Sequence, residues 1–218
     1  MTHSGHRERL RKKFSEGTLE DHELLELLLF YSIPRVNTNE TAHKLIDQCG
    51  CLGAVFGTDG ERLKRVSGVG ENSVALIRLI AELMRRQALE QCHTENILSS
   101  ETELHKYLSA IFIGEYEEKV YMLMFGKNGK FLSHEMIGDG LYDQSRITVK
   151  KAVKKAKEKG AEGVIIAHNH PNGIAHPSDA DRLEAGKMEI IFRNAGIKIL
   201  DNFIVASGKC VSFDGKNV

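Results

Sequence analysis

GVIIAHNHPNGIAHPSDAD, residues 163–181, combines the pattern of a buried strand, two histidines and the start of a helix. Side chains at positions i and i+2 of a strand point to the same side. His168 and His170 would therefore present both imidazoles to one point, while Asn169 faces away. The Pro-Ser-Asp sequence at residues 177–179 then restarts the chain as a helix. The stretch thus predicts a strand that delivers two imidazoles to the beginning of a helix.

The first turn of that helix carries a third candidate ligand, Asp181. Two neutral imidazoles and one carboxylate leave a fourth tetrahedral position open, where a catalytic zinc holds water and lowers its pKa to about 7. Ser178 and Asp181 also have the spacing of a capping box, and we expect both to cap the helix. Capping does not explain the histidines, which could alternatively be ordinary polar loop residues. The pattern favours a Zn²⁺ site made by His168, His170 and Asp181.

The segment HNHPNGIAHPSDAD resembles the HxHP…SxxD signature of the JAMM (MPN+) metalloprotein domain. AHNHP with PSxxD is similar to the RadC branch, long labelled as DNA-repair proteins. In JAMM enzymes the histidines and the aspartate bind zinc, and the serine helps to stabilise the tetrahedral intermediate. The resemblance therefore implies the metal ligands His168, His170 and Asp181 and a catalytic Ser178.

The resemblance covers nearly the whole chain, because RadC proteins also place a small helical domain before the JAMM domain. It implies an α/β fold in two parts. The first is a small all-α, helix-hairpin-helix-like N-terminal domain. The second is a JAMM/MPN (cytidine-deaminase-like) αβα C-terminal domain.

Zinc hydrolysis also needs a base, usually a carboxylate one hydrogen bond from the attacking water. JAMM enzymes place a glutamate at the start of an earlier strand, and aligning YEEKVYMLMFG on that strand implies Glu118. Its neighbour Glu117 and Glu135 on the partner strand are the alternatives, and each could equally be an exposed strand residue. His134 and Glu135 begin like the helical HExxH motif, but the second histidine is missing. We expect Glu118 to be the general base.

The N-terminal part shows helical periodicity and no strand-like alternation. The run LEDHELLELLLFYSI predicts a helix that Pro34 ends, with a buried stripe at Leu24, Leu27, Leu28 and Tyr31. Toward residue 100 the periodicity is lost and the chain becomes polar. We therefore expect a helical domain at residues 1–90, a linker at 91–100 and the JAMM/MPN domain at 101–218.

The sequence KRVSGVG predicts a tight hairpin between two helices. Gly68 and Gly70 allow the positive φ angles that such a hairpin requires, and Val69 can pack into the helices. This resembles the helix-hairpin-helix motif, which grips nucleic-acid phosphates with backbone N–H groups. The alternative is a plain connector between helices. The candidate DNA contacts are Lys64, Arg65, Gly68 and Gly70.

The C-terminal part changes to strand-like patterns. KVYMLMFG and KFLSHEMI read as two strands joined by an Asn-Gly turn, the strongest short-range hairpin signal. The remaining sequence predicts a helix at residues 146–159, a strand at GVIIA, a helix at about 178–194 and two strands around Ser207-Gly208. Asp201 is either a residue that supports the metal ligands or a turn residue, and we expect the turn. These elements together indicate an α/β module.

Composition limits the functional classes. Thirty Lys plus Arg balance thirty Asp plus Glu, so no global field attracts nucleic acid or anionic membrane. No apolar segment is long enough to span a bilayer or to form a signal peptide, which predicts a cytoplasmic protein without a membrane partner. The four cysteines form no CxxC pair, which predicts reduced structural thiols.

Two functions of different classes follow. The first is a zinc hydrolase of the metallopeptidase or isopeptidase type, in which Glu118 deprotonates water and Ser178 assists the oxyanion. The second is a DNA-associated repair or recombination protein in which the JAMM fold is structural and the glycine hairpin contacts DNA. A zinc nucleobase deaminase has a related αβα layout but needs HxE and PCxxC, which the sequence lacks.

Overall fold

A computed structural model describes residues 3–34, 36–95, 97–139 and 146–213. The chain divides into two compact units, Met1–Met84 and Arg85–Val218. Helix α6 (Glu71–Glu90) begins in the first unit and ends in the second. In the described parts of the chain, no helix is long and apolar enough to cross a bilayer.

The first unit is helical throughout its described residues, as the sequence predicts. Its core is formed by leucine, valine and isoleucine side chains from all the helices after α1, including Leu25, Leu45, Leu63 and Ile77. The helices that precede α6 are α1 (His3–Glu16), α2 (Asp21–Leu29), α3 (Asn39–Cys49), α4 (Leu52–Phe56) and α5 (Gly60–Lys64).

The predicted buried stripe of α2 is wrong at two of its positions. Leu24 is 39% and Tyr31 72% exposed, whereas Leu25 and Leu29 are buried in the core of the unit. Leu27 is also buried, in a second cluster that includes α1. Helix α2 thus buries more than one side and ends at Leu29, five residues before the proline. A continuous run of leucines puts apolar side chains on several sides of the helix. Periodicity alone therefore cannot tell which side is buried.

The second unit contains a five-stranded sheet in the order β2-β1-β3-β4-β5, in which only β3 and β4 are parallel. Every strand and helix predicted for this region is present. The elements are α7 (Glu101–Ile111), β1 (Lys119–Phe125), the 3-10 turn η1 (Lys127–Gly129), β2 (Phe131–Asp139), α8 (Arg146–Glu158), β3 (Gly163–Asn169), α9 (Asp179–Asn194), β4 (Lys198–Ala206) and β5 (Lys209–Ser212).

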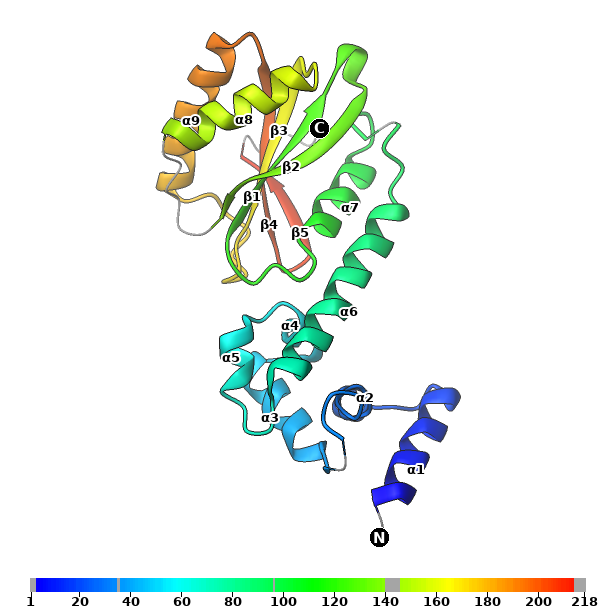
Figure 1. Ribbon diagram of the computed structural model, residues 1–218. Helices are drawn as coiled ribbons and strands as arrows, with labels where there is room; N and C mark the ends of the chain where they lie inside the picture. The colour runs from blue at the N-terminus through cyan, green and yellow to red at the C-terminus, as the bar shows by residue number, and fades with distance from the viewer. Residues whose placement is uncertain (1–2, 35, 96, 140–145, 214–218) are drawn as a thin grey trace. The chain divides into compact units, whose positions relative to one another are not determined.

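Helices cover both faces of this sheet, with α7 on one face and α8 and α9 on the other (Figure 1). The alternation along β1 builds both cores, since Leu123 and Phe125 belong to the α7 side while Met122 and Met124 belong to the α8 and α9 side. The second unit is therefore a mixed α/β fold of three layers.

Two individual residues of the second unit bear on the sequence predictions. The expected linker at residues 91–100 stays a prediction, and one of its residues, Ile97, is 1% exposed in the core on the α7 side. Asp201 lies inside β4 and not in a turn. Its carboxylate accepts hydrogen bonds from the Ser212 hydroxyl at 3.0 and 2.8 Å, which joins β4 to the edge strand β5.

The strand directions explain where polar residues meet. Strand β1 runs antiparallel to β3, and Val120 lies opposite His168. The residues just before β1 therefore lie beside the residues that end β3. Helix α9 begins after the loop that follows β3, so its first turn returns to the same end of the sheet.

Candidate metal centre

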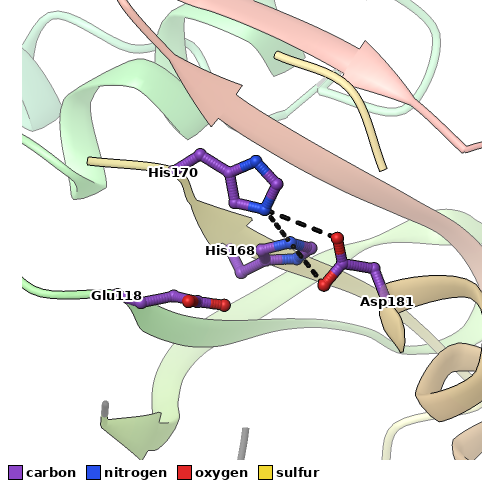
Figure 2. A group of neighbouring side chains, drawn as sticks. All are labelled: Glu118, His168, His170 and Asp181. Atoms are coloured by element: carbon purple, nitrogen blue, oxygen red, sulfur yellow. Dashed lines mark hydrogen bonds and ion pairs between the residues drawn. The ribbon is translucent and has the colours of Figure 1, made fainter. Parts of the chain in front are cut away.

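Four side chains from three separate segments point toward one another at this end of the sheet (Figure 2). Glu118 immediately precedes β1, His168 lies in β3, His170 follows β3, and Asp181 lies in the first turn of α9. Each offers one ligand atom, and these atoms all lie within 4.8 Å of one another. The structure thus brings together the three predicted metal ligands and the predicted base.

Two of the three distances among the predicted ligands are close to those around a tetrahedral ion, and the distance between the two histidine nitrogens is shorter. His168 Nε2 lies 3.0 Å from His170 Nε2 and 3.6 Å from Asp181 Oδ1, and His170 Nε2 lies 3.5 Å from Asp181 Oδ2. A zinc ion with bonds of about 2.0–2.1 Å places its tetrahedral ligand atoms roughly 3.3–3.5 Å apart. The residues present therefore fit a divalent cation with a fourth position left over.

The hydrogen bonding of His170 directs its Nε2 lone pair into the cluster. His170 Nδ1 lies 2.8 Å from the carbonyl oxygen of Ile174, which can only accept a hydrogen bond. Nδ1 therefore carries the proton, and Nε2 of the neutral ring is free to bind a metal. With the Nε2 atom of His168 only 3.0 Å away, a metal cation held between the two rings is favourable.

Burial prepares His168 for metal binding. His168 is 2% exposed, and burial lowers its pKa to about 4, although Asp181 opposes this shift. The imidazole is consequently neutral near pH 7, which is the form that binds metals.

Glu118 is the glutamate that faces the cluster. Burial raises the pKa of its carboxyl, while His170 acts in the opposite direction. The side chain of Glu117 is 55% exposed and lies 3.3 Å from Lys119 Nζ. Glu135 lies on β2, and its Oε2 atom forms an ion pair with Lys155 Nζ of α8 at 2.6 Å. Neither alternative is among the four residues of the cluster.

Ser178 and Asp181 form the predicted capping box of α9. The Ser178 hydroxyl and backbone N–H both donate to Asp181 Oδ2 at 2.7 Å, and the Asp181 N–H donates to Ser178 Oγ at 3.2 Å. Burial raises the pKa of Asp181. The hydrogen bonds from Ser178 and the two histidines lower that pKa by more than burial raises it, so the net pKa lies below the usual range. The cap thus holds an ionised carboxylate toward the histidines.

Sequence reasoning gave no role to Asn169 because it faces away from the histidines. It is 5% exposed, and its side-chain amide binds the backbone on both sides of Glu118. The signal available in the sequence is an amide side chain at a buried strand position, since buried polar groups need partners.

A family model for the RadC-like JAB domain matches residues 98–218, which include the whole cluster. The chain belongs to the RadC-like JAB family. A UPF0758 protein of Chromobacterium violaceum is 32% identical over 210 residues, 94% of this chain and 93% of the relative. UPF0758 proteins of Aliivibrio salmonicida and Pseudoalteromonas translucida are each 30% identical, and the alignments cover 90% and 95% of this chain and 88% and 92% of those relatives.

The second unit, which contains the RadC-like JAB domain, also has an open cavity that the cluster lines with His170. The cavity has a volume of about 940 Å³ and reaches His170 from the α7 side of the sheet. Its lining includes both polar and apolar groups, among them His105, Ser109, Phe112, Val205 and Ser207. This volume lies in the range of sites that bind small molecules or short segments of chain.

The predicted DNA contacts of this RadC-like chain lie in the first unit. Gly68 has a φ of +93°, whereas Gly70 has no positive φ, so only one glycine of the hairpin is used as predicted. Lys64 Nζ lies 2.6 Å from Glu61 and 2.7 Å from Glu71, which offset its charge. Arg65 is exposed at the end of α5. The hairpin thus presents little net positive charge.

Proposed function

We propose that this chain is a zinc-dependent amide hydrolase of the metallopeptidase or isopeptidase type. The observation that supports it best is the convergence of two imidazoles and an ionised carboxylate within 3.0–3.6 Å of one another, with a glutamate beside them. Metallohydrolases also occur among JAB domains. His168, His170 and Asp181 would hold the zinc.

A bound zinc would supply Lewis-acid polarisation of a carbonyl oxygen and a lowered pKa for coordinated water. Glu118 acts as the general base and removes a proton from the attacking water. Its raised pKa makes it a stronger base than an exposed carboxylate. The same carboxyl, once protonated, can deliver the proton to the leaving amine.

Ser178 contributes in two ways to this proposal. In the capping box, its backbone N–H and its hydroxyl both donate hydrogen bonds to Asp181 Oδ2. Because the backbone N–H also binds Oδ2, the hydroxyl can turn toward the developing oxyanion without leaving that oxygen unpaired. Ser178 would then assist the reaction directly.

The cavity beside His170 supports an extended chain as substrate. An open cavity of about 940 Å³ has room for several residues of a peptide, and His170 is the residue of the cluster that lines it. Linear peptides and lysine-branched isopeptides both contain an amide bond next to an extended chain, so the test includes both classes.

The test compares Glu118→Gln with the matched control Glu117→Gln. Each protein is loaded with zinc and incubated with a proteome-derived library of linear peptides and lysine-branched isopeptides, and mass spectrometry detects new termini. The unchanged chain and the control should cleave the same bonds, and a chelator should abolish cleavage. Glu118→Gln should keep its zinc yet cleave about 10²–10⁴ times more slowly. Equal cleavage by Glu118→Gln, or none by any zinc-loaded protein, would contradict the proposed function.

A further inference from the structure

The side chain of Asn169 bridges two backbone groups that flank Glu118. The Lys119 N–H donates to Asn169 Oδ1 at 2.7 Å, and Asn169 Nδ2 donates to the Glu117 carbonyl oxygen at 3.0 Å. Asn169 itself is the last residue of β3 and is 5% exposed. Its amide thus binds, across the sheet, a segment 50 residues earlier in the chain.

These two hydrogen bonds fix the backbone of Glu118. The Glu117 carbonyl and the Lys119 N–H are separated by the N–Cα and Cα–C bonds of Glu118, whose rotations are φ and ψ. One planar amide that binds both groups restrains both rotations together. The direction of the Cα–Cβ bond of Glu118 follows from φ and ψ, so the bridge also directs this side chain.

The strand ladder does not supply this restraint. Strand β1 begins at Lys119, and its pairing with β3 begins at Val120 opposite His168. Glu118 lies one residue outside the strand, where backbone pairing ends and chains fray. The Asn169 amide therefore replaces the missing ladder bonds at the position where the cluster needs a fixed carboxylate.

We propose that Asn169 is a positioning residue that holds Glu118 toward His168, His170 and Asp181. The inference rests on the proposed role of Glu118 at the metal centre. A purely structural role for Asn169 would stabilise the sheet without depending on Glu118. The two roles are separable because only the positioning role disappears when Glu118 is removed.

The test is a double-mutant cycle on zinc affinity, measured by competition with a chelator. Asn169→Ala should weaken zinc binding about tenfold in the unchanged chain. Glu118 lies among the ligands without holding the ion itself, so it is an outer partner of the metal site, and the loss of a fixed outer partner typically weakens metal binding by about 10–100-fold. In the Glu118→Ala background the same substitution should change affinity less than about twofold. Ser109→Ala, a polar change on the same cavity wall, is the matched control and should have no effect in either background.

A second readout follows the backbone directly. Hydrogen exchange of the Lys119 amide should accelerate in Asn169→Ala and remain slow in Glu118→Ala, because Asn169 Oδ1 accepts that hydrogen. If Asn169→Ala fails to fold, Asn169→Ser replaces it in the same double-mutant cycle, because a serine side chain cannot bridge both backbone groups.

Equal losses of zinc affinity in both backgrounds, or no loss in either, would overturn the positioning role. A chain that binds zinc and shows the coupling but cleaves no amide would instead contradict the proposed function alone. A chain that binds no zinc would overturn both.

Discussion

Asp181 shows how one side chain serves the fold and the candidate site together. Its Oδ2 closes the capping box with Ser178, and its Oδ1 lies 3.6 Å from His168 Nε2. The hydrogen bonds that begin α9 are therefore the same bonds that orient a ligand. The formation of the first turn of α9 therefore also places a ligand of the candidate metal centre.

His134 provides a prediction about pH at the scale of one residue. Its Nδ1 lies 2.6 Å from the Tyr107 hydroxyl, and burial lowers its pKa below the ordinary value of about 6.5, with Arg85 adding to the shift. The unfolded chain therefore binds a proton that the folded chain resists. This contribution to stability is complete above about pH 6.5 and is lost as the pH falls toward the lower folded pKa.

Urea unfolding followed by circular dichroism should detect this effect. Between about pH 7.5 and pH 5.5, the unchanged chain should lose up to about 1 kcal/mol more of its free energy of unfolding than His134→Leu does. Tyr107→Phe, which removes the hydrogen bond but keeps the imidazole, should lose as much as the unchanged chain. Identical losses in His134→Leu and the unchanged chain would show that His134 is not held neutral.

The sequence identifies the candidate ligands but not every residue that serves them. His168, His170 and Asp181 lie within 14 residues of sequence, so strand alternation and capping rules suffice to bring them together. The partners of Asn169 lie 50 and 52 residues away. That contact depends on which strand lies beside β3, and no local pattern contains this information.

At the scale of elements, the turns were easier to predict than the buried faces. The Asn-Gly turn between β1 and β2 adopts positive φ at both Asn128 and Gly129, as the dipeptide indicates. The face of α2 was predicted wrongly, because leucines occupy several of its sides and its burial depends on α1 as well as on the main core. Local backbone chemistry is readable from sequence, whereas packing partners are not.

The glycine hairpin before α6 gives a prediction with an internal control. Gly68 has a φ of +93°, and an added Cβ would lie 3.2 Å from Thr41 Oγ1. Gly70 has no positive φ, and nothing lies within 4 Å of its Cβ position. Gly68→Ala should lower the free energy of unfolding by about 1–3 kcal/mol. Gly70→Ala should change it by less than about 0.5 kcal/mol.

Thermal and urea unfolding of the two variants would measure the difference. If both substitutions reduced stability equally, the backbone conformation of Gly68 would not be the cause of its loss. The left-handed conformation assigned to Gly68 would then be contradicted.

At the scale of the whole molecule, charge argues against tight DNA binding. The chain has a formal net charge of zero, and Lys64 lies between two glutamates. Phosphate contacts supply most of the affinity for DNA, and they need uncompensated positive charge. We expect dissociation constants weaker than about 10 µM for duplex, single-stranded and branched DNA at about 150 mM salt.

Fluorescence anisotropy at several salt concentrations measures this directly. Tight binding that weakens steeply with salt, and that Lys64→Ala and Arg65→Ala together remove, would support the DNA-associated hypothesis.

The order of the strands and the division into two units also belong to this scale. The strand order does not follow from local patterns, because it depends on long-range pairing, whereas the expectation of two domains comes from the change of pattern along the chain.

The central claim is that His168, His170 and Asp181 hold a divalent metal, and metal analysis of the purified full chain tests it most directly. The comparison includes His168→Ala and, as a matched control, His176→Ala, whose ring lies in the same loop but outside the cluster. The unchanged chain and the control should each contain about one zinc ion. His168→Ala should contain less than about a tenth of that amount. An unchanged chain that holds no metal and takes up neither zinc, manganese nor iron would contradict the claim, as would full occupancy in His168→Ala.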